Sequence, residues 1–275
     1  MARHWKKVVG AVVAVVLVVM AATFIYVKFI NDPPDKLTTK DLDAALGADT
    51  TTPPTAVATD PASSASDSST TNPDATNPDT TNPDATNPDT TDPTPATDVA
   101  ATGVDGNWNV TTASELRYRV KETLNGLDTE AVGSTNSITG SLTLTANSAS
   151  AAEFTVDMTT FTSDESRRDA QFNGRIMQVD QFPTGVFTLT SPIDFGVVPS
   201  EGVEIAATAT GDLTLHGVTK SVTFDLTAKL ANGKIGVLGQ IPVLFSDYNV
   251  ESPSIATIVT EDNGLLEFVL VFEKA

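Results

Sequence analysis

The sequence contains no cysteine among its 275 residues. The chain can therefore form no disulfide, bind no zinc through thiolates and carry no acylated N-terminal cysteine. Basic residues are also few, with 16 Lys and Arg against 35 Asp and Glu and a net charge of −19. Proteins that bind nucleic acids cluster Lys and Arg to displace phosphate counterions, and no such cluster follows the N-terminus. We therefore exclude nucleic acid as a partner.

Histidine is nearly as scarce, since His216 is the only one after residue 4. No G-x-S-x-G motif accompanies it, and one histidine without cysteine is a poor set of metal ligands. We therefore predict no catalytic residue, no metal and no cofactor, and do not expect an enzyme. His216 precedes Gly217 between two strand-like segments, which favours a hairpin turn or a position at a rim. Contact with a ligand head group is the alternative.

One long apolar segment is present. Val8–Val27 has twenty residues without a charge, which at about 1.5 Å per residue in a helix spans roughly 30 Å of hydrocarbon. Arg3, Lys6 and Lys7 precede this segment, and the positive-inside rule places them in the cytoplasm. We predict that residues 1–30 form a cytoplasmic tip and a single transmembrane anchor, and that the rest of the chain lies outside the cell membrane.

A cleaved signal peptide is the rival interpretation of this segment. Ala21 and Ala22 are small enough for a cleavage site, but Val19 and Met20 fit an A-x-A pattern poorly, and the apolar run continues to Ile30. We favour the anchor, and whether the segment is ever cleaved stays open.

Residues 31–104 are rich in Thr, Pro and Asp and poor in large apolar side chains. From Asn72 the sequence repeats every five residues as NPD-x-T. Regular proline blocks helix and strand ladders, and such a composition cannot bury enough surface to fold. We predict a disordered linker. It is either a stalk that gives reach through a cell envelope or a low-complexity insert without a role, and its glycosylation stays open.

Residues 105–275 alternate apolar and polar side chains, for example in Phe154–Met158 and Val222–Leu230. This period of two predicts strands with one buried face and one solvated face. We expect about eight strands joined by turns such as Asn232-Gly233, with little helix between them. That pattern favours an antiparallel barrel or sandwich.

One short helix interrupts the strands. Thr162 and Glu165 have the spacing of a capping box, with Thr162 as the N-cap. Phe172, Ile176 and Val179 would then share one face. We expect this helix to cover or plug one end of a barrel, with its acidic residues explained by capping.

Several stretches of this domain resemble the YceI-like family. They are Trp108, SELRYRV (114–120), ITGSL (138–142), FTVDMTTFTSDESRRDAQF (154–172), FPTGVFTL (182–189), GDLTLHGVTKSVTFDL (211–226) and a closing strand near 265–273. The resemblance implies an all-β, extended eight-stranded antiparallel, lipocalin-like barrel over residues 105–275. It also implies an apolar interior that holds an isoprenoid or another amphiphilic lipid, without catalysis. LFSDYNV (244–250) departs from many relatives, which have a basic residue before the Asp.

If the interior is hollow, the resemblance implies a set of pocket-lining residues on the inward faces of the strands. They are Phe154, Val156, Met158, Phe187, Leu189, Leu213, Leu215, Val222, Phe224, Leu226, Phe268 and Leu270. An aliphatic tail among them would gain about 0.8 kcal/mol per buried CH₂.

At the rim, Arg168, Asp169 and His216 are candidates for contacts with a head group, because an arginine there can bind phosphate or carboxylate. A structural ion pair between helix and barrel is the alternative for Arg168 and Asp169. For the whole protein, the alternative to lipid binding is a filled barrel that serves as a non-catalytic envelope interaction or structural module. The identity of the lipid, its transport or storage, and a homodimer stay open.

Overall fold

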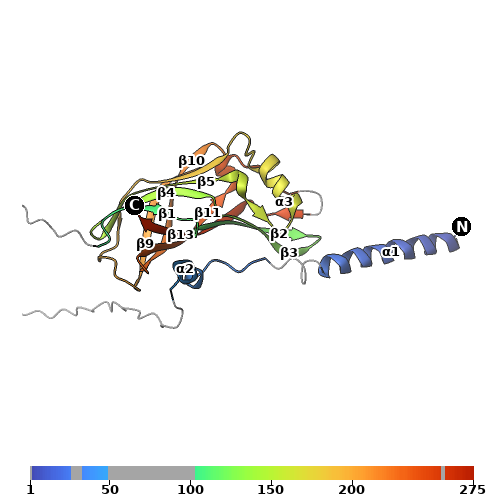
Figure 1. Ribbon diagram of the computed structural model, residues 1–275. Coiled ribbons are helices and arrows are strands. Elements are labelled where there is room, and N and C mark those ends of the chain that lie inside the picture. The colour runs from blue at the N-terminus through green and yellow to red at the C-terminus, as the bar shows by residue number, and fades with distance from the viewer. Residues whose placement is uncertain (1, 26–32, 49–102, 255–257) are drawn as a thin grey trace, which may run out of the picture. The chain divides into compact units, whose positions relative to one another are not determined.

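The computed structural model describes residues 2–25, 33–48, 103–254 and 258–275 (Figure 1). Its strands are β1 Gly106–Val110, β2 Glu115–Leu124, β3 Leu127–Thr135, β4 Ile138–Thr145, β5 Ser148–Asp157, β6 Thr162–Ser163, β7 Thr184–Leu189, β8 Ile193–Asp194, β9 Glu204–Leu215, β10 Val218–Ala231, β11 Lys234–Leu244, β12 Ile258–Thr260 and β13 Asn263–Lys274. Its helices are α1 Ala2–Ile25, α2 Thr39–Leu46 and α3 Ser166–Gln171, with short helical turns η2 Met158–Thr160, η3 Phe172–Ile176 and η4 Phe245–Tyr248.

Eight strands close into a ring in the order β1-β4-β5-β7-β9-β10-β11-β13, and β13 pairs back with β1. Each pairing in this ring is antiparallel. β13 is long enough to pair β1 through Phe272–Lys274 and β2 through Leu265–Val269. The prediction of a closed, eight-stranded antiparallel barrel is confirmed.

Two-residue turns set the register of the longest strands. Asn232 and Gly233 have φ of 53° and 69°, and Ala231 pairs with Lys234 across them. His216 and Gly217 have φ of 48° and 74° in the same arrangement between β9 and β10. Positive φ at both central residues gives a turn whose twist matches that of the flanking strands. His216 is therefore a hairpin-turn residue.

The short helix differs from the expected one at its start. Thr162 and Ser163 form β6, which pairs with Gly133 and Ser134 of β3, so Thr162 is not an N-cap. Glu165 caps α3 instead, and its side chain accepts a hydrogen bond from the Arg167 backbone N–H at 3.2 Å. The predicted capping box is wrong because Thr162 pairs with β3 as part of a strand, so the helix begins three residues later, after Glu165.

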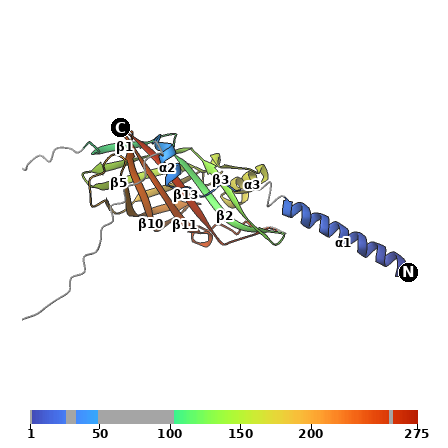
Figure 2. The same cartoon turned by 90° about the horizontal axis from the view of Figure 1, so that it is seen from below.

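Residues 33–48, which we name the strap, fall within the range predicted as a disordered linker. They contain α2, which lies against β11 and β13 on the outside of the barrel (Figure 2). Leu37, Leu42 and Leu46 are buried there with Val269 and Val271. Helix α2 begins with a capping box between Thr38 and Asp41 and ends at Gly47 with φ of 65°. The linker prediction is thus wrong for the strap, and residues 49–102 lie outside the described residues.

The N-terminal prediction falls only partly on described residues, because positions 26 and 27 of the expected span lie outside them. Helix α1 carries large apolar side chains that are exposed between Val12 and Ile25. Across the described portions of the chain, none of the helices combines the length and apolar character required for a membrane crossing.

Candidate functional site: two adjoining cavities

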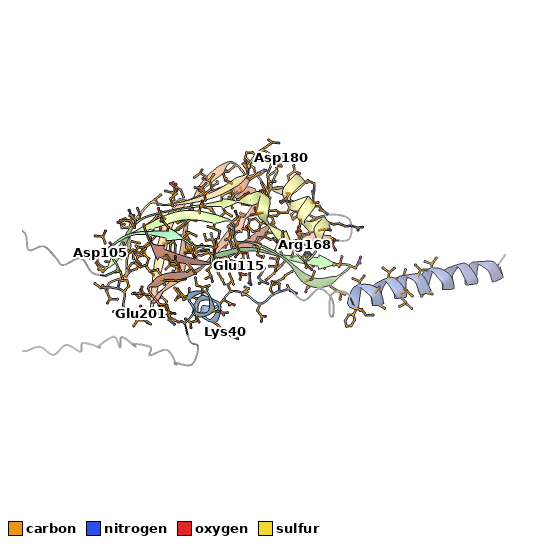
Figure 3. All side chains as sticks on the ribbon, in the orientation of Figure 1. Lys40, Asp105, Glu115, Arg168, Asp180 and Glu201 are labelled. Atoms are coloured by element: carbon orange, nitrogen blue, oxygen red, sulfur yellow. The ribbon has the colours of Figure 1, made fainter. Side chains whose placement is uncertain are left out.

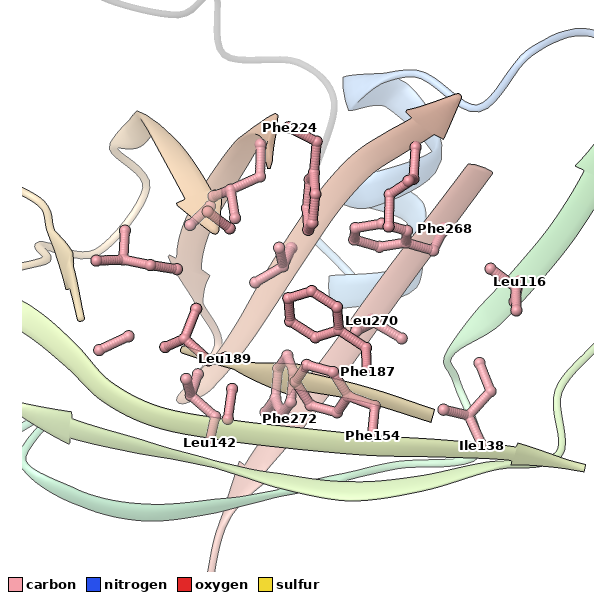
Figure 4. A pocket seen from close by; sticks show the side chains of 18 of the residues that line it. Leu116, Ile138, Leu142, Phe154, Phe187, Leu189, Phe224, Phe268, Leu270 and Phe272 are labelled. Carbon is pink, nitrogen blue, oxygen red and sulfur yellow. The ribbon is translucent and has the colours of Figure 1, made fainter. Parts of the chain in front are cut away.

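The interior of the ring holds a cavity of about 140 Å³, which we name the barrel cavity (Figure 4). Among the described residues that line it, Lys229 is the only charged one. The Lys229 ammonium contacts Asp43 at 2.6 Å and Glu204 at 3.7 Å, so its charge is neutralised by ion pairs. The cavity wall is therefore made of aliphatic and aromatic side chains that suit an apolar guest.

The structure places eleven of the twelve expected residues on this wall. They are Phe154, Val156, Met158, Phe187, Leu189, Leu213, Leu215, Phe224, Leu226, Phe268 and Leu270. Val222 does not line the cavity, although it packs against the same hydrophobic core. The alternation of apolar and polar residues correctly predicted that Val222 faces the core. It does not predict how far along the barrel axis a residue lies, and so whether that residue reaches the cavity.

Other lining residues were missed. Leu116, Ile138, Leu142, Leu144 and Phe272 belong to β2, β4 and β13 and also line the cavity. Leu142, Leu144 and Phe272 each lie on the apolar face of an alternating strand. The alternation that predicted the first set therefore also predicts these three.

Five phenylalanine rings crowd the middle of the barrel. Phe154, Phe187, Phe224, Phe268 and Phe272 form a connected set in which neighbouring ring centroids lie 5.6–6.3 Å apart. These separations are within the range of favourable aromatic contacts. Figure 4 shows Phe154, Phe187 and Phe272 close together, with Phe224 and Phe268 beyond them. The rings explain the small free volume of the barrel cavity.

Glycines on neighbouring strands make room for some of these rings. A Cβ on Gly239 would lie 2.4 Å from Phe268 Cζ, and one on Gly211 would lie 2.4 Å from Phe187 Cζ. Real Cβ atoms do not approach carbon so closely, so both rings rest against bare backbone. The missing side chains let the rings lie along the wall of the barrel.

A second cavity of about 450 Å³ adjoins the first and is lined by α3, η3 and the ends of several strands. The two cavities share Met158, Phe161, Leu215 and Leu266 as lining residues. This volume falls within the roughly 300–1,000 Å³ of ordinary ligand pockets, whereas the barrel cavity alone is smaller. The second cavity is therefore the larger of the two and lies beside the short helix.

The wall of the second cavity carries more charge than that of the barrel cavity, with Arg119, Glu122, Glu165, Arg167 and Arg168 among its lining residues. Arg168 lies 3.7 Å from Glu122 and pairs with Asp164 four residues before it. Burial raises the pKa of the Glu122 carboxyl, while Arg168 opposes that rise. Burial likewise raises the pKa of the Tyr118 phenol, whose ring stacks on Phe172 at 4.7 Å. The pair of Arg168 with Glu122 joins α3 to β2, as the structural alternative expects, and Arg168 also borders the second cavity.

The structure separates the other two rim candidates from Arg168. Asp169 accepts hydrogen bonds from the backbone N–H and the hydroxyl of Ser163 at 2.8 and 2.6 Å, which ties α3 to β6. His216 is buried against Phe182, and its Nδ1 lies 3.1 Å from the Tyr248 carbonyl oxygen. Its Nε2 has no hydrogen-bond partner among the described residues. Neither residue lines the two cavities.

The divergent stretch 244–250 borders the second cavity through Phe245, Tyr248 and Val250. Phe245–Tyr248 forms η4, and Tyr248 is buried, which raises the pKa of its phenol. The wall contributed by this stretch is thus largely apolar and aromatic.

The YceI-like domain model matches residues 108–272, which is the barrel and the short helix together. The chain therefore belongs to the YceI-like family. None of the curated proteins matches it.

Solved structures with a similar fold include BcnA from Burkholderia cenocepacia, at 20% identity and a TM-score of 0.48, covering 59% of this chain and 98% of that one. A polyisoprenoid binding domain from Saccharophagus degradans, implicated in plant cell wall breakdown, has 16% identity and a TM-score of 0.49, covering 62% and 98%. The YCEI protein of Campylobacter jejuni has 14% identity and a TM-score of 0.40, covering 52% and 84%.

Proposed function

We propose that this protein is a membrane-anchored, extracytoplasmic binding protein, not an enzyme, and that it holds an isoprenoid or another amphiphilic lipid. The apolar tail lies in the barrel cavity. The observation that carries the proposal is the composition of that cavity, whose lining residues are apolar except for the paired Lys229. The resemblance to the YceI-like family implies the same class of ligand.

The affinity in this proposal comes mainly from burial of the tail. Each buried CH₂ contributes about 0.8 kcal/mol, so a prenyl chain needs few polar contacts. The free volume of about 140 Å³ is small for such a chain, so the phenylalanine rings must turn aside when it binds. The second cavity, with about 450 Å³, takes the wider part of the molecule.

For the head group we propose Arg168, because it lines the second cavity and its guanidinium suits phosphate or carboxylate. Asp169 and His216 line neither cavity and contribute to the shape of the rim through Ser163 and Tyr248.

The proposed anchor is the uncharged segment Val8–Val27, flanked by Arg3, Lys6 and Lys7 on its cytoplasmic side. In support, the large side chains between Val12 and Ile25 are apolar and exposed, and contiguous exposed apolar surface marks interaction with a membrane or a partner. A detergent-free fractionation of cells tests this directly, since an anchored chain stays with the membranes after a high-salt wash.

A filled barrel that binds an envelope partner is the second candidate. The contacts among the five phenylalanine rings favour it, because they leave little open space in the middle of the barrel.

Organic extraction of the purified full chain, followed by mass spectrometry, separates the two candidates. Lipid binding predicts a stoichiometric isoprenoid or similar lipid in the extract. Leu215→Trp fills the junction of the two cavities and should remove the lipid, whereas Thr214→Trp on the outer face of β9 should retain it. An empty extract after mild purification, from a chain that also takes up no added lipid, would leave only the filled barrel.

A further inference from the structure

The strap is held on the barrel along its whole length. At its start, the Pro34 carbonyl oxygen accepts a hydrogen bond from Arg119 at 2.7 Å, and the Asp35 carbonyl oxygen accepts one from Arg117 at 3.3 Å. Near its end, Asn232 donates to the carbonyl oxygens of Leu46 and Gly47 at 3.1 and 2.9 Å.

Apolar packing and charge hold the middle of the strap. Leu42 is fully buried, and a Cβ on Gly236 would lie 2.5 Å from its Cδ1, so the leucine sits directly on the backbone of β11. The Asp43 carboxylate pairs with Lys229 at 2.6 Å, and both side chains are largely buried. Burial of a leucine at such a site stabilises the contact far more than a surface ion pair does.

The two ends of the strap lie at opposite ends of the barrel. Pro33 and Pro34 border the same surface groove as Asp164, which pairs with Arg168 of the second cavity. The other end binds the turn at Asn232, whose backbone N–H donates to Glu201. Figure 3 shows Arg168 and Glu201 toward opposite ends of the barrel. The chain therefore reaches the barrel beside the second cavity and runs away from it.

The strap and the barrel are separated in the sequence. Residues 49–102 follow the strap, and the chain returns at Gly103, whose carbonyl oxygen accepts a hydrogen bond from Lys274 at 3.0 Å. Only the seven residues 26–32 separate α1 from the strap. Fully extended, they span about 25 Å at most.

We infer that the strap holds the barrel with its second cavity toward the membrane that carries the N-terminal segment, so that an amphiphilic lipid passes between the bilayer and the barrel at that end. The orientation rests on the proposed anchoring, whereas the docking of the strap does not.

Cleavage of the full chain in detergent tests the docking. A site-specific protease sequence replaces part of the repeats, and size-exclusion chromatography then shows whether the two fragments stay together. We expect the wild-type fragments to co-elute. Leu42→Asp should weaken their association roughly a hundredfold or more, while Ala44→Asp, on the exposed face of α2, should not. If Leu42→Asp also unfolds the barrel, Asp43→Lys serves as a second variant. It places a lysine opposite Lys229 and should weaken the association of the fragments by a smaller factor. Separation of the wild-type fragments would overturn the inference.

Vesicles of phosphatidylcholine and phosphatidylglycerol that contain a nitroxide-labelled lipid test the orientation. Because the chain has no cysteine, one introduced cysteine carries the fluorophore. We expect stronger quenching at Ala170→Cys on α3 than at Ser200→Cys near Glu201, and loss of the difference in Leu42→Asp. Equal or reversed quenching in chains that float with the vesicles would contradict the orientation alone. Failure to float would contradict the proposed anchoring, and the orientation with it, but not the docking of the strap.

Discussion

At the scale of single residues, the wall of the barrel cavity depends on glycines as much as on phenylalanines. The Phe268 ring occupies the space where a side chain at position 239 would stand. A glycine that makes room for an aromatic ring cannot be predicted from alternation alone, because a glycine in a strand also marks bulges and bends.

Gly239→Ala should therefore push the Phe268 ring into the barrel cavity. We expect a loss of about 1–3 kcal/mol in the free energy of unfolding, as for other overpacked cores, together with less bound lipid. Urea unfolding and lipid extraction measure the two effects. Gly174→Ala is the control, because no atom outside its own helical turn lies within 4 Å of its Cβ position. If Gly239→Ala has the stability of the wild type, the Phe268 ring does not pack against the backbone of Gly239.

Glu122 should make stability depend on pH. In the folded protein, burial raises the pKa of Glu122 above its ordinary value of 4.5, and Arg168 offsets only part of this rise. The folded state therefore binds this proton more tightly than the unfolded state does. The contribution of Glu122 to the free energy of unfolding is then greatest below pH 4.5 and falls as the pH rises through the raised pKa.

Glu122→Gln removes that dependence. Its free energy of unfolding, measured in urea from acidic to neutral pH, should rise relative to that of the wild type as the pH increases. Glu261→Gln removes an exposed carboxylate and serves as the control. A constant difference between Glu122→Gln and wild type over the whole range would contradict the assigned environment.

At the scale of elements, long alternating strands such as β10 could be predicted from the sequence, and short elements could not. Thr162 and Glu165 have the spacing of a capping box, yet pairing with β3 makes Thr162 part of β6. The docking of the strap could not be predicted because its composition resembles that of the linker. Its three leucines form a buried face only against Val269 and Val271. The outward-facing valines of β13 were the available signal that something covers that strand.

The start of α3 provides a direct comparison of two caps. Glu165→Ala should cost about 0.5–2 kcal/mol of unfolding free energy, since its side chain satisfies the Arg167 N–H. Thr162→Ala should be nearly neutral, because its side chain is exposed and caps nothing. Chemical denaturation of both variants measures this. The opposite ranking would support the capping box and contradict the structure.

At the scale of the whole molecule, closure of the barrel depends on contacts that the sequence pattern cannot display. Trp108 of β1 pairs with Lys274 of β13, near the two ends of the domain. Alternation leaves barrel and sandwich both open, and the resemblance to the YceI-like family decided between them. Neither the alternation nor the resemblance predicts the free volume of the interior, because that volume depends on how five phenylalanine rings pack.

The central claim is that the tail of an amphiphilic lipid fills the barrel cavity. Titration of the full chain with prenyl alcohols of increasing length tests it most directly, since the head group is constant in the series. The account predicts that Kd falls with each added isoprene unit, by up to about 0.8 kcal/mol per buried CH₂, until the tail reaches the end of the barrel, where the gain stops. A Kd that does not change with chain length, or no binding at any length, would contradict it.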